Sequence, residues 1–103
     1  MDTCIFCKII KREIPSNIVY EDDHVVVFPD INPMKLIHLL IVPKKHIQEF
    51  LHIDDEEFHR IFSIVQKMIV DNNLETRGYR LVMNGGGFQD VDHLHNHLTG
   101  PWK

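Results

Sequence analysis

The 103-residue chain has little cysteine, only Cys4 and Cys7, and its hydrophobic stretches are short. Two cysteines are too few for the disulfide framework of a small secreted domain. No run of about 18 apolar residues is present to cross a membrane, and residues 1–4 lack the basic and then apolar layout of a secretory signal. We therefore expect a cytoplasmic protein that does not contact a membrane.

An excess of positive charge is also absent, since the formal net charge is -4 at pH 7. A protein that binds long nucleic acid by neutralising a row of phosphates needs the opposite balance. This excludes long nucleic acid as the expected partner. A small anion can still bind wherever positive groups gather.

The remaining composition is that of an ordinary globular protein, with 44% hydrophobic and 25% charged residues. A chain of this length has room for one hydrophobic core. No repeat, low-complexity tract or linker rich in Pro, Gly or Ser divides it. We expect residues 1–103 to form a single domain.

Short segments rich in β-branched residues alternate with turn residues. They predict strands at 18–21, 24–28, 37–42, 79–84 and 93–98. Most of the connections are too short for parallel crossovers, so the sheet should be antiparallel. One segment has helical spacing: Asp54 and Glu57 form a capping-box-like start, and apolar residues then recur every three or four positions. The sequence thus predicts an α+β fold, with about five strands and one main amphipathic helix over 55–72.

The run His93-Leu94-His95-Asn96-His97 places three histidines at alternate positions. Successive side chains of a strand point to opposite faces, so we expect the three imidazoles to share one face. A neutral imidazole is available near pH 7 as a nucleophile, a base or a metal ligand. The structural alternative is a solvated face of an edge strand. Because the run stands alone among well-patterned strands, it favours a functional site.

Five further segments accompany this run: CIFCKII at 4–10, EIPS at 13–16, YEDD at 20–23, FPDINP at 28–33 and HLLIVPKKH at 38–46. With them, nearly the whole chain resembles the histidine-triad (HIT) family, especially its nucleotide-binding Hint-like branch. The resemblance implies a HIT-like fold with a short N-terminal helical segment. It also implies a homodimer whose sheets join across the interface.

The resemblance assigns roles to three histidines. His95 corresponds to the nucleophile that takes up the nucleotidyl group and forms a phosphoramidate, which water or another acceptor then discharges. His97 corresponds to the phosphate-contacting histidine, and His38 to the buried partner that sets their hydrogen bonds. A covalent intermediate divides one difficult displacement into two easier ones, and donors near the phosphate stabilise its charge.

Other positions match the family's contacts with a purine nucleotide or nucleoside phosphoramidate. Asn84 matches the phosphate-side asparagine, and Asp30 matches the acidic residue that accepts from the ribose hydroxyls. The base pocket and the approach to the phosphate would be lined by Phe6, Phe28, Ile31 and Gln89. Without the resemblance, Asn84 and Asp30 are ordinary turn residues, and the apolar side chains are ordinary core residues.

A second set of residues, Cys4, Cys7, His46 and His93, matches the zinc ligands of some family members and of the related galactose-1-phosphate uridylyltransferases. Two thiolates and two imidazoles suit a tetrahedral zinc with no open position, which is a structural ion, so no catalytic metal is expected. Such an ion would fasten the N-terminal segment to the histidine strand. The alternatives are a redox pair, which lacks its usual βαβ context here, and two unpaired buried cysteines.

The chain departs from the family pattern close to the expected site. Asp90 stands where the family has a neutral hydroxyl, and the loop from Asn84 is about two residues short. A carboxylate only accepts hydrogen bonds, and it repels a phosphate oxygen unless it is protonated or turned aside. Asn96 replaces an apolar residue, which predicts a less deeply buried face. Trp102 either closes the site of a partner subunit or packs at the surface.

Three functions follow from these features. The leading hypothesis is a hydrolase or transferase that acts on a nucleoside phosphoramidate or nucleotide through a nucleotidyl-histidine. The rival is a catalytically weak, zinc-stabilised nucleotide-binding or scaffold protein whose phosphate site is impaired by Asp90. In the third, the histidines themselves bind a metal for hydrolysis or sequestration.

Overall fold

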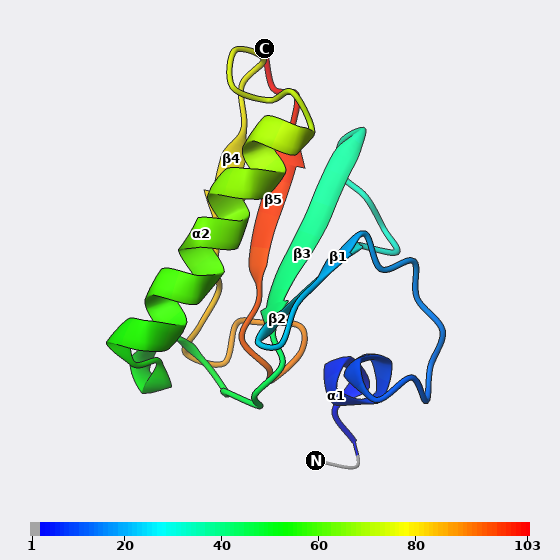
Figure 1. The fold of residues 1–103 in the computed structure, drawn as a ribbon, viewed down its shortest axis with the longest axis vertical. Coiled ribbons are helices and arrows are strands. Elements are labelled where there is room, and N and C mark those ends of the chain that lie inside the picture. Colours follow the sequence, from blue (N-terminus) through cyan, green and yellow to red (C-terminus); the bar gives the residue numbers. More distant parts are fainter. Residues whose placement is uncertain (1–2) are drawn as a thin grey trace.

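The computed structural model describes residues 3–103. Along the chain lie α1 (Ile5–Ile10), β1 (Tyr20–Glu21), β2 (Val25–Pro29), β3 (Ile37–Pro43), a 3-10 turn η1 (Phe50–His52), α2 (Asp55–Asp71), β4 (Arg80–Val82) and β5 (Asn96–Gly100). The strands form one five-stranded antiparallel sheet in the order β1-β2-β3-β5-β4. The long helix α2 lies over one face of the sheet, roughly parallel to β5, and α1 lies apart from it beside one end of the strands (Figure 1). The predicted α+β class, with one main helix and a short N-terminal helix, is confirmed.

The sheet separates two apolar clusters because alternate residues of each strand point to opposite faces. The cluster under α2 includes Val25, Val27, Leu39, Ile41 and Leu98. The cluster beside α1 includes Phe6, Ile9, Val26, Phe28 and Leu40. Paired residues of neighbouring strands share a face, and Leu40 pairs with His97 while His38 pairs with Thr99. These polar residues therefore lie on the α1 side of the sheet.

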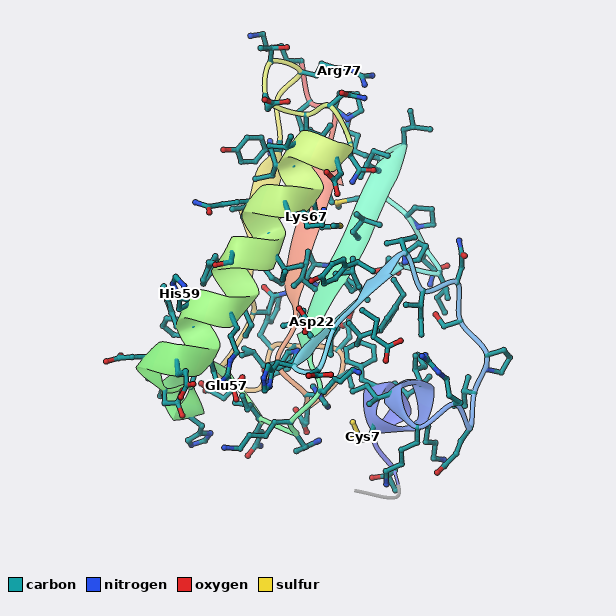
Figure 2. All side chains as sticks on the ribbon, viewed as in Figure 1. Cys7, Asp22, Glu57, His59, Lys67 and Arg77 are labelled. Carbon is teal, nitrogen blue, oxygen red and sulfur yellow. The ribbon has the colours of Figure 1, made fainter. Side chains whose placement is uncertain are left out.

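Helix α2 begins as its sequence predicts. The Asp54 carboxylate accepts a hydrogen bond from the backbone N–H of Glu57 at 2.8 Å, which satisfies one of the free donors of the first turn. The reciprocal half of a capping box is absent, since the buried Glu57 side chain lies 3.5 Å from Arg60 instead. Figure 2 shows Glu57 at this end of the helix. The helix ends at Asp71, one residue before the predicted end.

The last strand begins later than the sequence predicts. β5 spans Asn96–Gly100, so the predicted strand over 93–98 is confirmed at 96–98 and wrong at 93–95, and only His97 of the three histidines lies in a strand. Two hydrogen bonds outside the β-sheet hold the preceding residues away from the neighbouring strands. The Leu94 N–H donates to the Ile47 carbonyl at 2.7 Å, and the His93 ring binds the Pro43 carbonyl at 2.7 Å. His93 is thereby separated from the other two imidazoles. The other predicted strands overlap the observed ones.

Asn96 corrects a second expectation. Its side chain is only 2% exposed, because it lies on the same side of β5 as Leu98, beneath α2. Its Oδ1 is buried without a hydrogen-bond partner among the described residues. The face is therefore deeply buried in spite of the polar residue. Within residues 3–103, none of the helices is both long and apolar enough to traverse a bilayer.

Candidate active site

His95 is held by its backbone neighbour. Its Nδ1 lies 2.8 Å from the carbonyl oxygen of His93, and the residue is 5% exposed. A carbonyl only accepts, so Nδ1 carries the proton and Nε2 keeps its lone pair. The ring of Phe6 packs edge-on against the imidazole, with centroids 5.0 Å apart. The nitrogen able to act as a nucleophile is therefore fixed in identity and direction.

A chain of two imidazoles fixes the proton on His97. The backbone N–H of Met34 donates to His38 Nδ1 at 3.0 Å, so neutral His38 carries its proton on Nε2. That nitrogen lies 3.0 Å from His97 Nδ1 and donates to it. His97 must then carry its own proton on Nε2. The result is a hydrogen-bond donor of defined tautomer beside His95, whose ring centroid is 4.9 Å away.

Electrostatics keep His97 neutral. Burial lowers the pKa of His97 below its usual value, and positive charge on His95 or His38 lowers it further. The carboxylates of Asp30 and Asp90 oppose this without reversing it. Near pH 7 the ring therefore has one N–H donor and one acceptor, as the hydrogen-bond chain requires.

The two carboxylate oxygens of Asp30 have different partners. Its Oδ1 accepts from the Asn32 N–H at 2.9 Å and shapes the turn, while Oδ2 lies 3.4 Å from His38 Nε2. Asp30, His38 and His97 thus gather possible metal-ligand atoms. Because His38 Nε2 carries a proton as long as Met34 donates to Nδ1, this set is a poor metal site. The hydrogen bonds disfavour the third hypothesis.

Two cavities meet at His97. The first, of about 430 Å³, is bounded by α1 and the loop after β2, and it contains both His95 and His97. The second, of about 390 Å³, contains His97 but not His95. Of the residues predicted to contact a nucleotide, the first is lined by Phe6, Phe28, Asp30 and Ile31, and the second by Asp30 and Asn84. An apolar and a more polar compartment therefore adjoin one row of histidines.

The loop before the histidines places Gln89 outside the two cavities and Asp90 in both. The Gln89 amide is used within the protein: Nε2 donates to the Gln48 carbonyl at 3.3 Å, and Oε1 accepts from the Gly87 N–H at 3.1 Å. Gln89 lines neither cavity. The exposed Asp90 lines both, so its carboxylate lies where the two compartments join.

The structure also gathers Cys4, Cys7, His46 and His93. The sulfur of Cys4 lies 3.3 Å from His93 Nδ1, and that of Cys7 lies 3.5 Å from the same nitrogen and 3.2 Å from His46 Nδ1. Zinc bonds of 2.0–2.3 Å at tetrahedral angles place neighbouring ligand atoms roughly 3.3–3.8 Å apart. Cys7 projects from α1 toward the end of the sheet (Figure 2). The spacing and the donor types both fit a tetrahedral ion.

Proton positions in this cluster favour a cation as well. His93 Nε2 donates to the Pro43 carbonyl at 2.7 Å, which leaves Nδ1 as the free ligand atom, and burial lowers the pKa of His93 to about 4. Burial and the adjacent Cys4 raise the pKa of Cys7 to about 11. A buried thiol of this kind becomes a thiolate when a metal ion neutralises it. The four residues therefore fit a structural zinc.

The sequence did not reveal Arg80 and Thr99, which line the second cavity. Thr99 could have been found from its spacing of two residues from His97, had the strand been extended. Arg80 reaches the cavity only because β4 pairs with β5 in a register that places it opposite Thr99. Trp102 lines the cavity of its own chain, and its Nε1 donates to Thr99 Oγ1 at 2.8 Å.

Known proteins share this architecture. A family model described as the HIT domain matches residues 11–102. The chain is 42% identical over 101 residues to the purine nucleoside phosphoramidase of Escherichia coli K12, covering 93% of this chain and 85% of that protein. It is 46% identical over 98 residues to an uncharacterized HIT-like protein of Methanocaldococcus jannaschii, covering 92% and 76%. A crystal structure of a HIT family hydrolase from Legionella pneumophila has a TM-score of 0.89 at 40% identity, covering 98% and 95%.

Proposed function

The chain belongs to the HIT family, and from this premise we propose that it is a nucleotide-binding hydrolase or transferase that acts on a purine nucleoside phosphoramidate or nucleotide. One observation carries the proposal. His95 presents an unprotonated Nε2 to the apolar cavity, beside the fixed N–H of His97, where that cavity meets the more polar one. A nucleophile and an oxyanion donor in this arrangement suit displacement at phosphorus.

In the proposed mechanism, His95 Nε2 attacks the phosphorus while the bond to the leaving group breaks. The leaving nitrogen or oxygen takes the bonding electrons and a proton from solvent, and the nucleotidyl group remains on His95. The Nδ1–H of the now positive ring stays bound to the His93 carbonyl, which stabilises that charge. Water then attacks the phosphorus, His95 leaves with the electrons of the P–N bond, and the water releases a proton. His97 donates to a phosphate oxygen in both steps.

The cavities suggest how the nucleotide lies. Phe6, Phe28 and Ile31 would contact the base in the apolar compartment. The Asp30 carboxylate would accept from the ribose, and Asn84 would contact the phosphate from the second compartment. Gln89 would act indirectly by holding the loop, since its amide is already bonded to backbone groups.

Cys4, Cys7, His46 and His93 would hold the structural zinc. The bound ion would supply cross-linking and charge neutralisation, and the reaction would not pass through it. His93 would link the zinc site to the catalytic histidine, because its ring belongs to the cluster and its carbonyl binds His95 Nδ1. A cytoplasmic location remains the expectation from the sequence.

We further propose a homodimer. β4 is an edge strand of the sheet, and beside it lies an apolar groove of about 660 Å³ lined by residues of η1, α2 and β4. Leu51 on its rim is 83% exposed. An exposed apolar groove next to an open strand edge suits pairing with a second copy. Sedimentation velocity should give a dimer for the native chain and a monomer for Leu51→Glu; a monomeric native chain would reject this assembly.

The experiment that tests the function is hydrolysis of adenosine 5′-phosphoramidate, followed by release of AMP. We expect the native chain to be active and His95→Ala to lose activity by about a thousandfold or more, because the nucleophile is gone. Its zinc content should stay unchanged. The matched control is His59→Ala, which removes an exposed histidine of α2 (Figure 2) and should keep full activity.

Inactivity of the native chain at high enzyme concentration would reject the hydrolase. If such a chain still bound AMP, the alternative of a catalytically weak nucleotide-binding or scaffold protein would replace it.

A further inference from the structure

Two cationic side chains lie over the ring of Trp102. Lys35 Nζ is 4.1 Å from the ring centroid, and the guanidinium carbon of Arg80 is 3.8 Å from it. The Trp102 Nε1 donates to Thr99 Oγ1 at 2.8 Å, which anchors the indole to β5. Cation–π attraction thus holds both positive charges on the indole. Arg80 and Trp102 line the second cavity, and Lys35 contacts the same ring without lining it.

Neither cation has a carboxylate partner among residues 3–103. Other basic residues do form ion pairs, among them Arg12 and Lys44 with Glu21, and Lys67 with Asp71. The carboxylates in the same cavity are Asp30, which is engaged by Asn32 and His38, and Asp90 at the junction of the cavities. Two like charges on one ring repel each other, and an anion bound beside either of them would relieve that repulsion.

The position of this pair indicates which part of a substrate would meet it. Arg80 pairs with Thr99 across β4 and β5, one step along the same face from the pair of Val82 and His97. The cavity that contains Arg80 includes His97 but not His95. In an in-line displacement the leaving group lies opposite the nucleophile. A phosphate bound at His97 and attacked from His95 therefore directs its leaving group toward Arg80.

We propose that Arg80, held on Trp102 with Lys35 as a second charge on the same ring, forms a leaving-group subsite for an anionic group, either a carboxylate on a departing amine or a distal phosphate. The inference rests on the proposed function, because the direction of departure is defined by attack from His95. It names the substrate class: nucleoside phosphoramidates of carboxylate-bearing amines, or nucleotides with a further phosphate beyond the scissile bond.

The test compares three probes on the inactive His95→Ala variant, so that binding is measured without turnover. They are adenosine 5′-phosphoramidates of β-alanine and of its neutral amide, and ADP, with AMP as reference. Calorimetry should show about tenfold tighter binding of the β-alanine compound than of the amide. Trp102 is the only tryptophan, so its fluorescence should change with the anionic probes. The affinity of ADP relative to AMP, compared with the affinity of the β-alanine compound relative to its amide, shows whether phosphate or carboxylate is the preferred anion.

Variants assign the effect to the residues named. Adding Arg80→Gln, or Lys35→Gln with it, should abolish the preference for the anionic probes. Lys67→Gln removes one positive charge from α2, on the other side of the sheet, and should keep it. The inference is overturned if the acid and the amide bind equally and ADP gains nothing over AMP, or if the preference survives in the Arg80 and Lys35 double variant. If the subsite is rejected in this way, hydrolysis of the neutral amide by the native chain would still support the proposed function. If none of the probes bound, the subsite and the proposed function would both be rejected.

Discussion

His93 contacts the cysteine cluster with its ring and His95 with its backbone. Its ring nitrogen Nδ1 faces the sulfurs of Cys4 and Cys7, and its backbone carbonyl accepts from His95 Nδ1. The ring and the carbonyl cannot move independently, because they share one Cα. A metal ion on the ring would therefore also limit the motion of the carbonyl that binds His95.

Asp90 is the residue whose substitution should raise activity. Its exposed carboxylate lies at the junction of both cavities, where it would repel the phosphate. We expect Asp90→Ser to raise kcat/KM for adenosine 5′-phosphoramidate by about threefold to tenfold at low salt, and less at high salt as the repulsion is screened. Steady-state kinetics at two ionic strengths would measure this.

The matched control for that substitution is Asp92→Ser. Asp92 is also exposed, but it lines the cavity beside Cys4 and His46 and neither of the two that contain His97. Its kcat/KM should stay within about twofold of the native value. Equal kinetics in Asp90→Ser and the native chain would mean that the carboxylate is turned away from the phosphate.

Among the elements, the hairpin of β1 and β2 depends on one carboxylate. Asp22 Oδ1 accepts from the N–H groups of His24 and Val25, both at 2.8 Å, and Oδ2 accepts from the Tyr20 hydroxyl at 2.8 Å. Burial raises the pKa of Asp22, but these hydrogen bonds outweigh it and leave the pKa below its usual value. Figure 2 shows Asp22 beside the strands that it connects.

This depressed pKa predicts a pH-dependent stability. The folded carboxyl binds its proton less readily than the unfolded one, so its contribution is complete above pH 4 or so and is lost as pH falls through the folded pKa. Asp22→Asn should lower the free energy of unfolding by about 1 kcal/mol at pH 7. This difference between the variant and the native chain should disappear at low pH. Urea denaturation across this range measures it. The control variant Asp23→Asn, at the exposed neighbour, should show neither effect. If the destabilisation by Asp22→Asn did not change with pH, the carboxylate of Asp22 would not be its cause.

Elements whose cause is local could be predicted from the sequence, and those set by distant contacts could not. The start of α2 depends on Asp54 and Glu57, which are three residues apart, and the prediction of this helix was correct to within one residue at its end. The start of β5 depends on the carbonyls of Pro43 and Ile47, about half the chain away. The candidate metal ligands could be named only through a resemblance to a known family. Arg80 could not be placed near Trp102 from the sequence, because its position depends on the register of β4 against β5.

The cysteine and histidine cluster joins three segments that are distant in the sequence. Cys4 and Cys7 come from α1 and its N-cap, His46 from the connection after β3, and His93 from the approach to β5. A metal ion there would close long loops and hold α1 against the sheet. In a domain of this size, one such cross-link forms a large part of the net stability.

Removal of the metal should therefore destabilise the whole chain. We expect about one zinc ion per chain. A chelator should lower Tm of the native chain by about 10 °C or more. The Cys4→Ser, Cys7→Ser variant should bind no zinc, and its Tm should not respond to chelator. A native Tm that ignores the chelator would argue against the site, and two or more ions with ligation by His95 or His97 would favour a metal function for the histidine run.

The role of His95 as the nucleophile can be tested by following the nucleotidyl group during one turnover. Excess native chain is mixed with adenosine 5′-phosphoramidate, stopped in alkali to preserve a histidine phosphoramidate, digested, and mapped by mass spectrometry. We expect an adenylyl group on His95 that forms before AMP is released. An adenylyl group on another residue, or AMP formed throughout the turnover with no labelled peptide, would show that His95 is not the nucleophile.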